Sequence, residues 1–154
     1  MIPVAFSLHV LSAAIWVGGM FFAYMVLRPI AAMQLEPPER LALWSNVFSK
    51  FFPWVWACVV MLLGTGFWLV YNKFGGFELV AGHIHIMTSV GIIMTLIFIY
   101  VFFWPARRLS AAVEQADWSN AAHFLAQARL LIGVNLLLGL SIIAVASGGR
   151  YLFS

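Results

Sequence analysis

Hydrophobic residues in this chain gather into four long runs that short polar stretches separate. The runs cover about residues 2–27, 48–71, 80–104 and 124–146. Each is long enough to cross the hydrocarbon core of a bilayer, which takes roughly 20 apolar residues in a helix. Because a spanning segment must satisfy its own backbone hydrogen bonds, the pattern predicts four transmembrane α-helices.

These four helices use nearly the whole chain, so we expect residues 1–154 to form one domain. The first run lacks a preceding basic segment and is too long for the apolar part of a secretory signal, so it is expected to stay as the first helix. The prediction is an all-α fold, a four-helix transmembrane bundle made of two helical hairpins.

Sequence details suggest where the helices end. Arg28-Pro29 is expected to end the first span, with a polar loop over residues 34–40. The third span should continue as an amphipathic helix over 106–116, and Asp117 or Ser119 should cap the fourth helix. Gly148-Gly149 is expected to close that helix. Four aromatic residues near the start of the second span are expected to form an interfacial belt: Phe51, Phe52, Trp54 and Trp56.

Composition agrees with a membrane protein. The chain is 64% hydrophobic and 8% charged, and its mean hydropathy is +1.02, which excludes an ordinary soluble domain. The net charge of +3 comes from basic residues that flank the spans. Basic residues beside the spans are typical of membrane proteins, in which they set the orientation. The lipid bilayer is therefore the expected partner, and nucleic acid is not.

The basic residues also predict the orientation. One side of the membrane holds most of them, namely Arg28, Arg40, Lys50, Arg107, Arg108 and Arg129, and the other holds Lys73 and Arg150. Positive charge is enriched on the cytoplasmic side. Both termini are therefore expected outside, and in a bacterium the protein would be a multi-pass protein of the inner membrane with its histidines toward the periplasm.

The first and third spans resemble each other. Each opens with an aliphatic-His-aliphatic triplet, at His9 and His85, and each closes with a proline, at Pro29 and Pro105. The offset from histidine to proline is 20 residues in both. This repeat suggests two hairpins related by a pseudo-two-fold axis along the membrane normal.

The repeat pairs His9 with His85 as candidate ligands of a haem iron. Both lie on helices that run the same way, roughly 8–10 Å inside the span at 1.5 Å per residue. Axial histidine is a common haem ligand, and haem sits in the core of helix bundles. His83 differs from His85 by about 200° around the helix, so it cannot serve the same iron.

Other side chains suit a b-type haem. Trp16 lies one heptad from His9 and could wall a porphyrin. Lys73, Arg150 and Tyr151 lie on the outer side, where haem propionates would need cations or donors. With two strong ligands the iron favours electron transfer, with quinone or a periplasmic redox partner, so a membrane oxidoreductase is one outcome.

Simpler interpretations stand beside this one. A membrane histidine often bonds a neighbouring helix, His83 suits the interface, and His123 suits the opposite surface. The methionines are scattered and suit packing. Arg129 and Asn135 either hold the bundle together or bind a polar ligand near the inner leaflet.

Copper is the alternative ligand. Cu(I) accepts imidazole and thioether groups. His83 and Met87 share a helix face at a spacing of four residues, and His9 and Met1 lie on the same side of the membrane. A copper-binding or copper-uptake protein is therefore the second hypothesis, and a structural subunit without cofactor, including a homo-oligomer, is the third.

At "LHVLSAAIWVGGMFF" the chain resembles the CopD family of bacterial membrane proteins, which is associated with copper resistance. Its length and four-span layout are also similar to HemJ-type protoporphyrinogen oxidases. That resemblance implies a haem-associated His at His9 and a second segment at "GHIHI", where His83 takes the family's His and His85 replaces its Lys. Pro53 with "GFWLV", and Arg129, echo two further motifs of that family.

Overall fold

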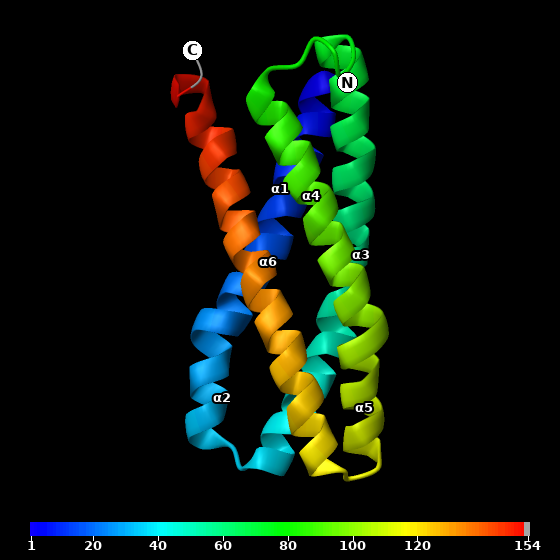
Figure 1. Cartoon of the computed structure of the whole chain (residues 1–154), viewed down its shortest axis with the longest axis vertical. Coiled ribbons are helices and arrows are strands. Elements are labelled where there is room, and N and C mark those ends of the chain that lie inside the picture. The colour runs from blue at the N-terminus through cyan, green and yellow to red at the C-terminus, as the bar shows by residue number, and fades with distance from the viewer. Residues whose placement is uncertain (153–154) are drawn as a thin grey trace.

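The chain is entirely helical over the part that the structure describes. This computed structural model describes the backbone of residues 1–152 and the side chains of residues 1–148. Four helical segments are long and apolar enough to cross a membrane: Ile2–Gln34, Pro37–Phe74, Gly82–Glu114 and Trp118–Gly148. They pack as a bundle (Figure 1), which confirms the predicted fold class.

The first and third spans are each built from three consecutive pieces. The first contains α1 (Ile2–Phe21), the π-helical segment η1 (Phe22–Leu27) and α2 (Arg28–Gln34). The third contains α4 (Gly82–Val101), the π-helical segment η2 (Phe102–Ala106) and α5 (Arg107–Glu114). The second and fourth spans are the single helices α3 (Pro37–Phe74) and α6 (Trp118–Leu152).

A proline explains the π-helical segment in each of these spans. Pro29 and Pro105 lack an N–H group, and a proline ring crowds the carbonyl oxygen four residues earlier. A local π turn takes up this conflict without breaking the helix. The prediction that Arg28-Pro29 ends the first span is therefore wrong, because the helix continues to Gln34. The two π segments agree with the predicted repeat, while the pseudo-two-fold axis stays a prediction.

Several helix ends follow the sequence, and others do not. Asp117 accepts a hydrogen bond from the backbone N–H of Asn120 at 3.3 Å, as expected of the residue that caps α6. Gly75 ends α3 with a positive φ of 80°, which glycine adopts without strain. The expected loop over 34–40 shrinks to two residues, because Pro37 starts the next helix. Gly148-Gly149 does not close α6, which runs on to Leu152.

The helices pack mainly as the predicted hairpins. α1 lies along α3, and α4 lies along α6, while α6 also touches α1. Figure 1 shows that α1 begins and α6 ends at the same end of the bundle, and that α2 leans away from the bundle axis. Large apolar side chains such as Leu130 and Leu137 face outward, exposed by 68% and 66%, as expected where lipid covers the surface.

Aromatic rings fill the middle of the bundle. Phe48 and Phe52 on α3 stack at 4.9 Å between ring centroids, and Phe98 on α4 meets Phe52 edge-on at 5.5 Å. Phe52 is buried, so it belongs to this core and not to the predicted interfacial belt. Trp54, which is 65% exposed, remains outside as the belt prediction requires.

Candidate functional site

Three histidines lie near the end of the bundle where α1 and α4 begin, which we call the histidine end. His9 belongs to α1, and its Nδ1 lies 2.9 Å from the hydroxyl oxygen of Thr65 on α3. The Thr65 hydroxyl donates its only hydrogen to the carbonyl oxygen of Met61. When the hydroxyl donates to Met61 it accepts from His9, and the imidazole tautomer with its proton on Nδ1 then has a lone pair on Nε2.

The His9 ring lies close to the backbone of α3. A Cβ atom added at Gly66 would come within 3.3 Å of the His9 Cε1 atom, so a glycine at this position gives the imidazole its room. Gly64 and Gly66 are small residues of the kind that permits close contact between membrane helices. Gly66 does so, whereas a Cβ atom at Gly64 would meet open space.

The two histidines of α4 lie on different sides of the helix, as their spacing predicts. His83 is half-buried and lies eleven residues, or three turns, before the buried Met94. His85 is exposed and lies eleven residues before Leu96, which is 60% exposed. His83 is therefore turned toward the bundle, and the expectation that His85 faces the core does not match the structure.

The structure does not join His9 to His85 within its described part. His9 contacts α3, while the His85 ring lies 6.2 Å from the ring of Phe77 in the connection before α4. Among the described residues, no three His, Cys, Asp or Glu side chains gather around a point that could hold a metal ion. A haem bound by both histidines therefore stays a prediction.

The remaining predicted haem contacts lie apart. Trp16 is buried and meets Phe98 edge-on at 6.1 Å in the middle of the bundle. The Lys73 ammonium lies 5.7 Å from the ring centre of Phe6. The side chains of Arg150 and Tyr151 lie outside the described residues.

Met87, the thioether of the copper hypothesis, is half-buried between α4 and α6. It lines a small apolar cavity with Val90 of its own helix and with Leu138 and Ile142 of α6. His83 precedes it by four residues, so the two side chains are neighbours on one helix surface. The pair thus faces into the bundle at the histidine end.

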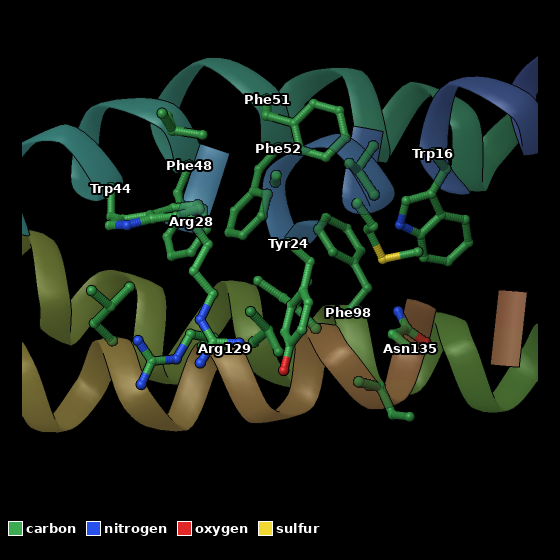
Figure 2. Close-up of a pocket in the computed structure, with 18 residues that line it drawn as sticks. Trp16, Tyr24, Arg28, Trp44, Phe48, Phe51, Phe52, Phe98, Arg129 and Asn135 are labelled. Carbon is green, nitrogen blue, oxygen red and sulfur yellow. The ribbon is translucent and has the colours of Figure 1, made fainter. Parts of the chain in front are cut away.

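A second cavity lies further along the bundle, toward the connection between α2 and α3. Its free volume is only about 40 Å³, because the side chains that line it fill most of the space. Its walls come from all four spans (Figure 2), and seven of the 18 lining residues are aromatic: Trp16, Tyr24, Trp44, Phe48, Phe51, Phe52 and Phe98. We call it the aromatic cavity.

Two arginines stand at one end of the aromatic cavity. Arg28 opens α2 and Arg129 belongs to α6, and Figure 2 shows both side chains directed to the same region. The Arg28 guanidinium lies 4.8 Å from the ring centre of Tyr24, and the positive charges of Arg28 and Arg40 act on Arg129. In the described part of the chain, neither Arg28 nor Arg129 forms an ion pair with a carboxylate.

Asn135 marks the other end of the aromatic cavity. It is 2% exposed, and its Nδ2 group donates to the carbonyl oxygen of Met94 at 3.2 Å, which links α6 to α4. Asn135 therefore links two helices of the bundle, which is one of its two predicted roles. Its Oδ1 atom remains a buried acceptor without a donor.

Comparison with known proteins bears on the two metal hypotheses. A family model described as copper resistance protein D, CopD, matches residues 45–148, which is more than half of the chain. The chain belongs to the CopD family. No curated protein and no solved structure matches it.

The CopD match covers most of α3 and everything from α4 to Gly148. It includes His83, Met87, Arg129 and Asn135, whereas His9 precedes it. The "LHVLSAAIWVGGMFF" stretch, on which the expected family rested, lies in the first span and precedes the matched residues. The expected family is therefore confirmed by a different part of the chain.

Sequence reasoning missed most of the aromatic cavity of this CopD family member. The sequence marks Arg28 only as an orientation signal and as the expected end of the first span, and it does not single out Tyr24 and Trp44. One signal was present, because Tyr24 and Arg28 are four residues apart and therefore neighbours on a helix. The partners from α6 could not be paired with them without the fold.

Proposed function

We propose that this CopD family member binds copper at the histidine end, with His9, His83 and Met87 as its imidazole and thioether ligands. Imidazole and thioether groups suit Cu(I). The description of the family as copper resistance protein D supports the metal. Copper is here the cargo or regulatory ion that the protein handles in the membrane.

The hydrogen bond between His9 and Thr65 carries this proposal. Metal-bound histidines almost always donate their other N–H to an oriented acceptor, which fixes the ring and leaves the second nitrogen for the metal. His9 has this arrangement, because its Nδ1 bonds Thr65 and Thr65 in turn bonds the Met61 carbonyl oxygen.

His83 and Met87 add two donors that share one surface of α4. Side chains four residues apart on a helix lie about 5–6 Å apart at their Cβ atoms, which lets both approach one ion. Both are half-buried and turned toward the bundle. They sit at the same end of the bundle as His9, although α1 packs mainly on α3 and α4 mainly on α6. The copper-binding proposal uses all three side chains and requires the ion to draw the donors of α1 and α4 together.

A b-type haem is the second candidate, since the free Nε2 of His9 also suits an iron atom. In this case His85 would be the other axial ligand, with Trp16, Lys73, Arg150 and Tyr151 around the porphyrin. Electron transfer to quinone or a periplasmic partner, or a HemJ-type oxidation of porphyrinogen, would be the activity. The exposure of His85 on α4 makes this candidate weaker than copper.

Metal analysis of the purified protein separates the two candidates. The protein is produced with both copper and a haem precursor supplied, and its copper, iron and absorption spectrum are measured. We expect about one copper per chain and no Soret band. His83→Ala and Met87→Leu should each lower the copper content, while His85→Ala, on the opposite side of α4, should not. Bound iron together with a Soret band that His85→Ala abolishes would contradict the copper proposal and favour haem.

A further inference from the structure

The aromatic cavity combines a charged end with an apolar body. We propose that its charged end binds the head group of an anionic phospholipid, with the lipid phosphate between Arg28 and Arg129. This site is separate from the copper site, because it lies at the other end of the bundle and shares none of the proposed copper ligands.

The two arginines require a negative partner. Both guanidinium groups are half-buried and directed to one region (Figure 2), where like charges repel each other. The described part of the chain supplies no carboxylate to either of them. An anion between them would remove this repulsion and accept charge-assisted hydrogen bonds from both.

The position of the arginines favours an anion that belongs to the membrane. Arg28 and Arg129 come from different spans and lie where those spans approach the short connections of the bundle. Basic pockets between transmembrane helices at this depth are typical sites for lipid head groups. A phosphate of the adjacent leaflet is present there at high local concentration.

The rest of the aromatic cavity is filled by its own side chains. Phe48, Phe52 and Phe98 are buried there and their rings contact one another. The phosphate is therefore held at the charged end alone, and the acyl chains of the lipid stay in the surrounding bilayer. A soluble anion lacks these chains, so the position of the arginines within the membrane is what favours a lipid.

The walls of the charged end are built by close helix contact. The Tyr24 ring lies under the Arg28 guanidinium and reaches α6 at Gly133, where an added Cβ atom would come within 3.0 Å of the ring. Asn135 lies six residues beyond Arg129, or about 9 Å along the helix, so a phosphate at the arginines does not reach its free oxygen.

Lipid retention tests this proposal. The full chain is purified in nonionic detergent and mixed with dioleoyl phosphatidylglycerol, dioleoyl phosphatidylcholine or inorganic phosphate, and bound lipid is counted by native mass spectrometry. We expect one phosphatidylglycerol per chain. Arg28→Gln and Arg129→Gln should each weaken its retention by about tenfold, since each removes charge-assisted hydrogen bonds to the phosphate.

Arg108→Gln is the matched control, because Arg108 is a cation at the same end of the bundle that lies over the Trp104 ring, 4.5 Å from its centre, outside the cavity. It should retain phosphatidylglycerol as the wild type does. If all three variants lost phosphatidylglycerol equally, surface charge alone would explain the retention and the proposal would be overturned. Displacement of the lipid by inorganic phosphate, or equal retention of phosphatidylcholine, would also overturn it.

Folding is checked by the helical circular dichroism of each variant. If Arg129→Gln fails to fold, two other variants test the proposal. These are Arg28→Gln on the other span and Arg129→Lys, which keeps the charge. Arg129→Lys should retain more lipid than Arg28→Gln. The reverse order would contradict a phosphate held by charge at this site.

Discussion

At the scale of single residues, the orientation of the His9 imidazole depends on one hydrogen-bond partner from another helix. The Thr65 hydroxyl lies within hydrogen-bond distance of His9 Nδ1 and of the Met61 carbonyl oxygen, so a short chain of hydrogen bonds orients the ring. Such second partners orient a metal ligand and raise its basicity. Thr65 should therefore matter for copper although it does not touch the metal.

Thr65→Val tests this role, because valine keeps the shape of threonine and removes the hydroxyl. We expect Cu(I) affinity to fall by about 10–100-fold, the usual effect of losing a partner of a metal-bound histidine. Thr65→Ser keeps the hydroxyl and should stay close to the wild type. Affinity is measured by competition with a chromogenic Cu(I) chelator, and equal affinities of the valine and serine variants would contradict the role.

At the scale of elements, glycines decide how closely the spans approach. A Cβ atom at Gly133 would meet the Tyr24 ring at 3.0–3.2 Å, and one at Gly139 would meet Val17 at 2.8 Å. Small residues at helix contacts are typical of membrane bundles, where close packing stabilises association. These glycines of α6 therefore set its distance from the first span.

Gly133→Ala should destabilise the bundle, because Tyr24 or α6 must shift to admit the methyl group. Overpacking of this kind typically lowers the free energy of unfolding by about 1–3 kcal/mol. Gly91→Ala on α4 is the control, since its Cβ atom meets open space. Thermal unfolding followed by circular dichroism should give a lower midpoint for Gly133→Ala alone, and two equal midpoints would refute this account of the contact.

The elements also show what the sequence could and could not predict. The four spans follow directly from run length, and the cap at Asp117 from its residue type. The rotation of α4 about its own axis cannot be predicted in this way. Its apolar residues lie on all sides of the helix, so no polar stripe marks the side that faces the bundle. The sequence could therefore separate His83 from His85 without telling which of them faces inward. The aromatic cavity needed the side chains of four spans, which only the fold brings together.

At the scale of the whole molecule, the two ends of the bundle have different chemistry. The histidine end offers imidazole and thioether groups, and the opposite end carries most of the basic residues. From the positive-inside rule we expect the proposed copper site outside and the proposed lipid site in the inner leaflet.

Cysteine labelling tests this orientation. Cys58 is buried, so a Cys58→Ala background removes the only native thiol. In that background Glu78→Cys, near the histidine end, should react in intact cells with a membrane-impermeable maleimide. Glu36→Cys, in the connection between α2 and α3, should react only after the membrane is opened. The opposite pattern would invert the predicted topology.

The central claim is that His9 is a preset ligand for copper, and Cu(I) titration of three proteins tests it most directly. The wild type, His9→Ala and His85→Ala are titrated in detergent against a chromogenic chelator, with circular dichroism as the check on folding. We expect His9→Ala to bind Cu(I) at least about tenfold more weakly than the wild type, while His85→Ala matches the wild type. Equal affinity of His9→Ala and the wild type, with the helical fold intact, would contradict the account.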